Sequence, residues 1–413
     1  MNNSHEKTNG RKDNPMRPAQ SHAANCPQRL TVENFGPIQK ADVTFGDLTV
    51  FVGPQAAGKS ILLQLYKLLV DRGAIQSRLT HFGIDWRGKA DAFLEAYFGE
   101  GMGDLAGSGT KVTWDGHAQT FAGLASRRGK LGEDESVFFI PAQRVMAFHA
   151  TNGWLRGWSD FRDGDPFVVR DFGAKLHSLA QSEFDKPGVV FPQTRRFKTA
   201  IRNQLIDAIF GGFELRLEQK GGLQRRLVLG RKEGQALALT VWSAGQREFV
   251  PLLLGAYHLL PRAGVGRRDP LKCAVLEEPE MGLHPRGISA VFLLILDLLS
   301  RGYRVCLSTH SPHILDILWA LRAFRQHGGT GRDVLDLFAL PSNPETKKLC
   351  AAALDPQKLT QVYYFDRTSG STRDISSLDP GSEEGAINGW GGLSEFSGRA
   401  NDAVASLVAN SQA

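Results

Sequence analysis

The chain has 413 residues, of which 42% are hydrophobic, and a formal net charge of +6. This length suits two or three domains, or one large discontinuous domain with a substantial core. The longest apolar run, residues 290–307, is interrupted by Asp297, Arg301 and Arg304, so we expect no membrane span and no membrane partner. The positive charge is compatible with a polyanionic partner but is too small to indicate one.

The first residues and the cysteines indicate a cytoplasmic protein. Residues 1–28 lack the apolar stretch of a signal peptide, and we expect a disordered tail there. The cysteines show no CxxC spacing, and two of them sit in apolar runs that are typical of buried strands. We therefore interpret them as reduced core thiols rather than metal ligands or disulfide partners. They are Cys26, Cys273, Cys306 and Cys350.

Regular patterning begins at Arg29. Apolar alternation followed by helical spacing predicts three strands, a glycine-rich turn and a helix. Their ranges are 29–36, 41–45 and 47–53 for the strands and 58–73 for the helix. Residues 73–132 are expected to be an insertion with a helix near 90–99 and a hairpin near 111–123. Residues 136–144 are a candidate buried strand.

The second half of the chain alternates strands and helices. Two apolar segments that run into polar residues are typical of central parallel strands, and a crossover helix joins them. The strands are residues 272–279 and 303–312, and the helix is residues 284–302. Residues 150–240 are mixed and partly helical, residues 362–367 form a late strand, and the Gly- and Ser-rich segment 369–393 is expected to be a mobile loop. There are no heptads, so no long arm is expected.

This order of elements predicts an α/β fold with a mostly parallel sheet flanked by helices. The core is expected to combine three separate segments, with an insertion and a basic helical lobe between them. The boundaries are 29–72, 133–150 and 241–413 for the core, 73–132 for the insertion, and 151–240 for the lobe.

The strongest motif is GPQAAGKS, which fits the phosphate-loop pattern GxxxxGK[ST]. It follows an apolar strand and opens an amphipathic helix, so its backbone N–H groups and the helix N-terminus can hold phosphates. Lys59 would reach the β- and γ-phosphates of ATP, and the Ser60 hydroxyl would bind Mg²⁺. The predicted nucleotide-binding residues here are Gly53, Pro54, Gln55, Ala56, Ala57, Gly58, Lys59, Ser60 and Ile61.

Two acids end the strand that begins near residue 272. We expect Glu277 to hold the water shell of Mg²⁺ and Glu278 to polarise the water that attacks the γ-phosphate. The alternative for such a segment alone is a charged strand end that faces solvent. The phosphate loop in the same chain favours the catalytic interpretation.

Polar residues also end two further strands. His310 could hydrogen-bond a γ-phosphate and sense its loss, whereas His313 is expected to be structural. Gln143 could contact Mg²⁺ or the attacking water, and Arg144 could contact a phosphate or cap a loop. The predicted catalytic residues are Glu278, His310 and Gln143, and the predicted metal ligands are Ser60, Gln143 and Glu277.

A second anion site is indicated far from the phosphate loop. Ser243, Ala244, Gly245 and Gln246 form a small polar cluster just before an apolar helix. A helix start of this kind can hold an anion. These residues alone leave open which phosphate it would bind.

In their order along the chain, the phosphate loop, the glutamine at a strand end, SAGQ, EEPE and THS resemble the motifs of the ABC-type ATPases. More specifically, EEPEMGLHP, STHSP and the opening LTVENFGPIQKADVTF resemble the SMC/RecF/OLD-like branch, AAA-family ATPases of bacterial defence or repair type. The resemblance covers residues 29–72, 136–144 and 240–315, and more faintly residues 362–367.

The resemblance implies an ABC-type P-loop NTPase head with an inserted lobe that carries a signature motif. Ser243, Gly245 and Gln246 match that motif, which in the family binds the γ-phosphate of ATP held by a second subunit. Residues 283–285 fall where a loop lies across the dimer interface. The chain departs from the family at Trp242 and Ala244 in the signature, at Gln55 and Ala56 in the phosphate loop, and at Glu277, where transporters carry Asp.

Residues 194–233 are strongly basic, with ten Lys or Arg residues against four acids. This segment could contact DNA or RNA phosphates, or it could be a solvated face that is partly a hairpin. No acidic cluster with metal-ligand spacing follows His310, so any nuclease or toxin is expected to be a separate effector chain.

We therefore expect a Mg²⁺-dependent ATP hydrolase that forms a homodimer, or a higher homo-oligomer, through an ATP sandwich. It would act as a dimerisation switch in anti-phage defence or DNA repair, together with the effector. The alternative is an ATP-binding regulatory scaffold that holds an effector with little turnover. The long separation of phosphate loop and signature disfavours a transporter subunit.

Overall fold

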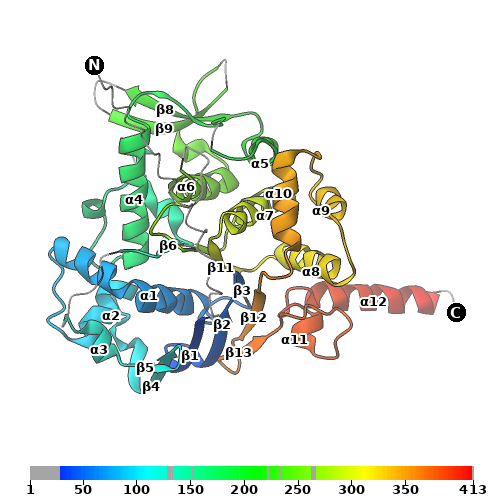
Figure 1. The fold of residues 1–413 in the computed structure, drawn as a ribbon, viewed down its shortest axis with the longest axis horizontal. Coiled ribbons are helices and arrows are strands. Elements are labelled where there is room, and N and C mark those ends of the chain that lie inside the picture. Colours follow the sequence, from blue (N-terminus) through cyan, green and yellow to red (C-terminus); the bar gives the residue numbers. More distant parts are fainter. Residues whose placement is uncertain are drawn as a thin grey trace, which may run out of the picture.

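The computed structural model describes residues 28–411 except 128–131, 133, 151–152, 195, 221–223, 232–233 and 262–266. The expected disordered tail, residues 1–28, lies outside the described residues except for Gln28, which begins the first strand. Helices cover a ten-stranded mixed sheet, and the chain ends in a helix that leaves the body (Figure 1). None of the described helices is long and apolar enough to cross a membrane.

Five parallel strands form the centre of the main sheet, in the order β12–β3–β11–β10–β6. They span Thr360–Asp366 (β12), Leu48–Val52 (β3), Arg304–Thr309 (β11), Cys273–Glu277 (β10) and Val137–Ile140 (β6). Every residue of β3, β6 and β10 is buried, as parallel strands covered on both faces require. The predicted α/β fold with a mostly parallel sheet is confirmed for this centre.

Mostly antiparallel pairs extend the sheet beyond β12, where only β13 (Ser371–Asp374) and β2 (Ile38–Phe45) pair in parallel among the described strands. β13 pairs with β12 and with β2, and β2 pairs with β1 (Gln28–Phe35). The hairpin of β4 (Ala106–Trp114) and β5 (His117–Gln119) comes from the expected insertion. Because β4 pairs with β1, this insertion completes one edge of the main sheet.

The two faces of the sheet carry separate apolar cores. In β3, Val50 and Val52 pack in one core and Phe51 packs in the other, because side chains alternate along a strand. The core that contains Phe51 includes residues of α1 (Lys59–His81), α2 (Ala90–Phe98) and α3 (Phe121–Ala125). The other core includes residues of α6 (Ala244–Leu259), α7 (Pro285–Ser300), α8 (Pro312–Gln326), α9 (Gly331–Leu337) and α10 (Pro344–Leu354).

The lobe formed by residues 151–240 has its hairpin at the opposite end of the molecule from β1 (Figure 1), whereas Phe167 and Val168 at the start of its first helix pack in the same core as β1. It contains α4 (Phe167–Glu183), α5 (Thr199–Leu205) and a separate antiparallel sheet of order β7–β8–β9. These strands span Gly188–Phe191, Glu214–Lys220 and Gln224–Gly230. The expectation of a helical lobe is therefore wrong in part, because alternating apolar and charged side chains in β8 and β9 favour a hairpin.

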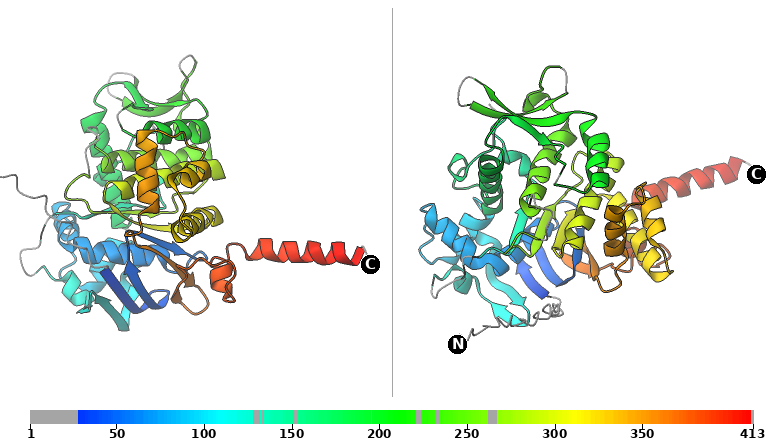
Figure 2. Two further views of the ribbon diagram at one scale, coloured as in Figure 1. Left: turned by 45° about the vertical axis from the view of Figure 1, so that its right-hand side comes forward. Right: turned by 45° about the horizontal axis from the view of Figure 1, so that its top comes forward.

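The chain ends in α11 (Gly385–Asn388) and α12 (Glu395–Ser411). In both views of Figure 2, α12 extends away from the body, so the expectation that no long arm projects is wrong for this 17-residue helix. The mobile loop expected at residues 369–393 contains β13 and α11 instead. The ladder between β12 and β13 orders this segment despite its glycines and serines.

Candidate functional site

The phosphate loop joins β3 to α1. Three of its residues have positive φ angles, which are +142° for Gly53, +60° for Ala56 and +95° for Gly58. A Cβ atom on Gly53 would lie 2.4 Å from the carbonyl oxygen of Phe365, and one on Gly58 would lie 2.6 Å from Cγ1 of Ile38. Both positions therefore need glycine. Alternation between positive and negative φ turns successive N–H groups to one side, which is how such loops hold anions.

The remaining loop residues differ in exposure. Pro54, Gln55 and Ala56 are exposed, whereas Ala57 is buried. Ser60 and Ile61 lie half-buried in the first turn of α1. The loop thus presents its middle to solvent while both of its ends are packed into the protein.

Lys59 is folded into the loop. The residue is 5% exposed, and its Nζ donates hydrogen bonds of 2.7 Å to the carbonyl oxygens of Gly53 and Pro54. Burial lowers the pKa of Lys59 to about 8, although nearby glutamates, Glu278 first among them, oppose the shift. The ammonium group therefore lies inside the loop and could exchange its carbonyl partners for phosphate oxygens.

Glu277 ends β10 beside the first turn of α1. It is 1% exposed, and its Oε2 accepts a hydrogen bond of 3.0 Å from the N–H of Ala142. Its buried Oε1 has no partner at ordinary hydrogen-bond distance within the described chain. The nearby Ser60 hydroxyl nevertheless acts to lower the pKa of Glu277. Burial outweighs these contacts and raises the pKa of Glu277. A free carboxylate oxygen beside a hydroxyl is a donor set that suits Mg²⁺.

Glu278 and His310 meet at the carboxyl edge of the sheet. His310 Nε2 lies 3.3 Å from Glu278 Oε1, and each side chain is a little more than one quarter exposed, at 27% and 28%. The hydrogen bond from His310 lowers the pKa of Glu278, whereas partial burial opposes that effect. Glu278 also has a φ of +43°, which is unusual for a residue with a side chain. The structure therefore brings together the predicted base and the predicted sensor.

A third acid in the same run, Glu280, is a site residue that sequence reasoning missed. Its Oε1 accepts hydrogen bonds of 2.7 Å from the Thr309 hydroxyl and from the backbone N–H of His310. Burial raises the pKa of Glu280. Glu280 therefore fixes the backbone from which His310 reaches Glu278, and the repeated acids of EEPE were the signal for it.

Gln143 and Arg144 follow β6 and point in different directions. Gln143 is exposed, and its side chain makes no hydrogen bond within the described part of the chain. Arg144 is 0% exposed and donates hydrogen bonds to the carbonyl oxygens of Glu248, Glu277 and Glu278. These bonds to the end of β10 and to the loop that follows it agree with the loop-capping alternative for Arg144. Gln143 remains available at the edge where the metal would lie.

The predicted second anion site is a well-formed helix start. Ser243 is the N-cap of α6, and its Oγ accepts the N–H of Gln246 at 3.2 Å. The Gln246 Oε1 accepts the N–H of Ser243 at 3.1 Å, which completes a capping box. Trp242 is buried, and its indole N–H donates to Leu237. Ser243 itself is exposed, so the N-terminus of α6 is accessible to an anion.

The GLHP segment packs against this helix start. A Cβ atom on Gly245 would lie 2.6 Å from the carbonyl oxygen of Gly282, so the two backbones are in close contact. Leu283 follows, His284 caps α7, and Pro285 is its first residue. The signature residues and the loop that the resemblance places at the dimer interface therefore form one surface.

Several described cations of the basic segment, residues 194–233, make contacts within the protein. Arg196 is 2% exposed and bonds two backbone carbonyl oxygens, and Lys198 pairs with the buried Asp297. The β8–β9 hairpin contains the ion pairs Arg216–Glu214 and Arg226–Glu218. These contacts favour a structural role for the segment over a nucleic-acid surface.

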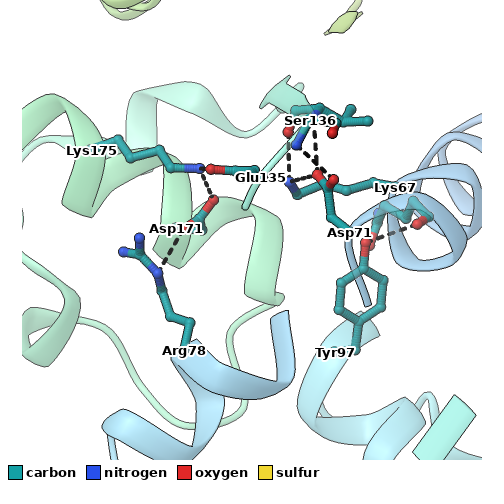
Figure 3. Close-up of polar contacts among 10 residues, drawn as sticks. Lys67, Asp71, Arg78, Tyr97, Glu135, Ser136, Asp171 and Lys175 are labelled. Atoms are coloured by element: carbon teal, nitrogen blue, oxygen red, sulfur yellow. Dashed lines mark hydrogen bonds and ion pairs between the residues drawn. The ribbon is translucent and has the colours of Figure 1, made fainter. Parts of the chain in front are cut away.

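A cluster of buried charges links α1, the start of β6 and α4 (Figure 3). The Nζ of Lys67 lies 3.1 Å from Oδ2 of Asp71 and 2.6 Å from Oε1 of Glu135. Lys175 pairs with Asp171 at 2.6 Å and also with Glu135. Asp71 interrupts the helical dihedral angles of α1 and accepts two backbone N–H groups at the start of β6. The helix that follows the phosphate loop is therefore tied to the lobe through ion pairs that sequence reasoning missed.

Residues 178–316 match the family described as "AAA domain, putative AbiEii toxin, Type IV TA system". This range runs from α4 into α8 and contains the signature, both strand-end acids and His310. No curated protein matches the chain.

Solved structures similar to the chain include two SMC heads. The SMC head bound to the C-winged helix domain of ScpA is 12% identical, with a TM-score of 0.38, over 84% of this chain and 95% of that chain. The SMC head domain from Thermotoga maritima is 14% identical, with a TM-score of 0.32, over 84% of this chain and 97% of that chain. The family match covers about one third of the chain, and it shows that residues 178–316 are similar to this AAA domain.

Proposed function

We propose that the protein is a Mg²⁺-dependent ATP hydrolase whose turnover controls the dimerisation of two copies. The observation that carries the proposal is the convergence of the phosphate loop, the Glu277–Ser60 pair and the Glu278–His310 contact at one edge of the sheet. These are the groups that hold phosphates, a metal ion and an attacking water in phosphoryl transfer.

Ser60 and Glu277 would hold the metal ion, with exposed Gln143 as a further ligand. Bound Mg²⁺ would neutralise charge on the β- and γ-phosphates. Lys59 would leave the carbonyl oxygens of Gly53 and Pro54 and donate to the phosphate oxygens instead. The loop N–H groups and the first turn of α1 would hold the remaining phosphate charge.

Glu278 would accept a proton from the attacking water. Its lowered pKa keeps it a carboxylate at neutral pH, so its Oε atoms can only accept protons or hydrogen bonds. His310 would orient that carboxylate through the contact at Oε1, and Glu280 would hold the His310 backbone in place. Loss of the γ-phosphate would then remove a hydrogen-bond partner of His310.

The second half of each active site would come from a second copy. Ser243 and the first turn of α6 form an exposed helix start with its own capping box, but neither hydrogen bonds nor ion pairs link it to residues 53–61 within the described chain. An anion site that its own chain does not use suits the γ-phosphate of another copy's ATP. ATP would therefore join two copies, and hydrolysis would release them.

The decisive experiment compares the full chain with Glu278→Gln. We expect the parent to hydrolyse ATP at a rate per chain that rises with protein concentration, and we expect Glu278→Gln to lose turnover and accumulate as an ATP-bound dimer in light scattering. ATP binding without a change in mass in either protein would refute the switch.

A regulatory scaffold with little turnover is the second candidate. It is favoured by the positive φ of Ala56 in the phosphate loop and by Trp242 and Ala244 in the signature, since these departures could slow hydrolysis. A scaffold should hold its effector equally well in the parent and in Glu278→Gln. The hydrolysis switch should hold or release it differently in the two.

We further propose that the protein acts in the cytoplasm, where ATP is available, in anti-phage defence or DNA repair with a separate nuclease or toxin as effector. The matched family, described by its toxin–antitoxin system, supports a defence setting. The internal pairing of the basic segment makes a protein effector better supported than a DNA or RNA partner. Co-purification with the product of a neighbouring nuclease gene would test this role, and a permease as the partner would contradict it.

A further inference from the structure

Arg144 joins two elements of this chain that carry different functions. Its Nη1 donates to the carbonyl oxygen of Glu277 at 2.9 Å, and its Nη2 donates to that of Glu278 at 3.0 Å. Its Nε donates to the carbonyl oxygen of Glu248 in α6 at 2.8 Å. A single, fully buried guanidinium therefore connects the end of β10 to α6, the helix that Ser243 caps.

Under the proposed function, the two ends of this contact belong to different ATP sites of the dimer. Glu277 and Glu278 serve the nucleotide on the chain's own phosphate loop, whereas α6 presents its N-terminus to the nucleotide of the second copy. The planar donor fork of an arginine holds its acceptors in a fixed mutual arrangement. A shift of the acids on nucleotide binding is therefore transmitted to α6 through this side chain.

Two neighbouring features strengthen the connection. The carboxylate of Glu248 lies 3.6 Å from Nε of Arg144, which adds an ionic contact between Arg144 and α6. Glu278 has a φ of +43°, and such a backbone persists only where its surroundings hold it. Its carbonyl oxygen is held by Arg144 and its N–H by Ser308, at 3.0 Å each.

We propose that Arg144 is a positioning residue that couples the two ATP sites of the dimer, and this inference rests on the proposed function. Burial alone does not account for the arrangement, because its acceptors are divided between the two functional elements. Arg170 provides the comparison. It is 1% exposed and donates to the carbonyl oxygen and a carboxylate oxygen of Asp163, and neither of these hydrogen bonds reaches β10 or α6.

The test follows amide hydrogen exchange in the full chain with Glu278→Gln, at a protein concentration where mass photometry shows monomers. Mg²⁺-ATP then acts only on the chain's own phosphate loop, so a response in α6 must arise within one chain. We expect ATP to slow exchange in residues 53–61 and, by at least about five-fold, in the first turns of α6, which is the lower end of typical coupling between sites. With Arg144→Lys, the response of residues 53–61 should remain and that of α6 should be lost.

Arg170→Lys is the matched control for loss of a buried arginine, and it should keep both responses. In chains with Glu278 intact, Arg144→Lys should lower kcat by about 10–100-fold with little change in KM, the range for a residue that supports catalytic groups. Arg144→Gln provides a second variant with the same expected pattern in case the lysine variant does not fold.

The possible failures are distinguishable. A response of α6 that persists in Arg144→Lys, or that is absent from the parent, would overturn the coupling. A phosphate loop that ATP does not protect in the parent would instead refute nucleotide binding itself, and with it the proposed function.

Discussion

The Nε2 atom of His310 lies 3.3 Å from Oε1 of Glu278, and this contact joins the ends of two neighbouring parallel strands. The hydrogen bond from His310 is the main cause of the lowered pKa of Glu278, followed in effect by partial burial, which opposes it. A carboxylate held in its charged form can take a proton from water at neutral pH. The contact therefore sets the protonation state on which the proposed reaction depends.

Replacing His310 by alanine should raise the pKa of Glu278. The acid limb of the pH–rate profile should then move to higher pH, and kcat at neutral pH should fall by about 10–100-fold, the range for a residue that supports a catalytic group. Steady-state ATPase assays across pH measure both effects. His313→Ala is the control, because His313 contacts Ser289 at 2.8 Å and lies outside the site. An acid limb that does not move in His310→Ala would contradict the assigned contact.

The same contact has a defined effect on folding. Because the folded pKa of Glu278 is lowered, its hydrogen bond with His310 adds stability above the ordinary glutamate pKa, and this stability is lost as pH falls through the folded pKa. In His310→Ala, the free energy of unfolding should therefore fall less between neutral and acid pH than it does in the parent.

Binding of ATP should draw a proton from solution near pH 8. The pKa of Lys59 is about 8 in the nucleotide-free chain because of burial, so a fraction of these ammonium groups is neutral there. Phosphate oxygens would raise that pKa and return the lysine to its charged form. Calorimetry in buffers of different ionisation enthalpy should show proton uptake at pH 8 that vanishes near pH 6.5. Lys59→Arg stays charged throughout and should abolish the pH-dependent uptake.

Blocking the helix start at Ser243 should separate nucleotide binding from dimerisation. Ser243→Arg should bind ATP with parental affinity, because its own phosphate loop is untouched, yet lose ATP-dependent dimerisation and most hydrolysis. Ser243→Ala removes the same N-cap, worth about 1 kcal/mol of helix stability, without adding bulk. Binding of a fluorescent ATP analogue measures nucleotide affinity, and light scattering measures ATP-dependent dimerisation, in both variants. Normal hydrolysis by Ser243→Arg would contradict the role of the signature in the second copy's site.

The site could be predicted largely because its residues mark the ends of strands. Each of the motifs GPQAAGKS, EEPE and STHSP directly follows an apolar run, and parallel strands bring their carboxyl ends to one edge. The pairing of Glu278 with His310 follows from that topology. The same rule predicts nothing about which side chains then point inward.

Arg144 and the buried charges could not be predicted for this reason. The acceptor on Glu248 lies 104 positions along the chain from Arg144, and Glu135 lies 68 positions from Lys67. In sequence, Lys67 and Asp71 have the i, i+4 spacing of an ordinary exposed helical pair. Their burial depends on α4 and β6 closing over them, which local patterns do not encode.

Relief of backbone strain at Ala56 should stabilise the chain. Ala56 has a φ of +60°, which costs a residue with a Cβ atom about 1–2 kcal/mol relative to glycine. Ala56→Gly should therefore raise the free energy of unfolding by roughly 0.5–1 kcal/mol after the entropy that glycine loses is subtracted. Ala57→Gly is the matched control, because Ala57 has no positive φ and should lose stability. Urea denaturation without nucleotide measures the free energy of unfolding of both variants. Equal changes in the two would contradict backbone strain at Ala56.

Breaking the buried ion pairs at Lys67 should destabilise the fold strongly. Burial alone would lower the pKa of Lys67, but the carboxylates of Glu135 and Asp71 outweigh it and raise the pKa, so the lysine is charged in the folded chain. Lys67→Met should leave these acids uncompensated and lower the free energy of unfolding by about 3–5 kcal/mol. Lys111→Met breaks the exposed pair with Glu33 and should cost less than about 1 kcal/mol. If urea denaturation gave similar losses for both variants, the cluster would not be the stabilising link between α1 and the lobe.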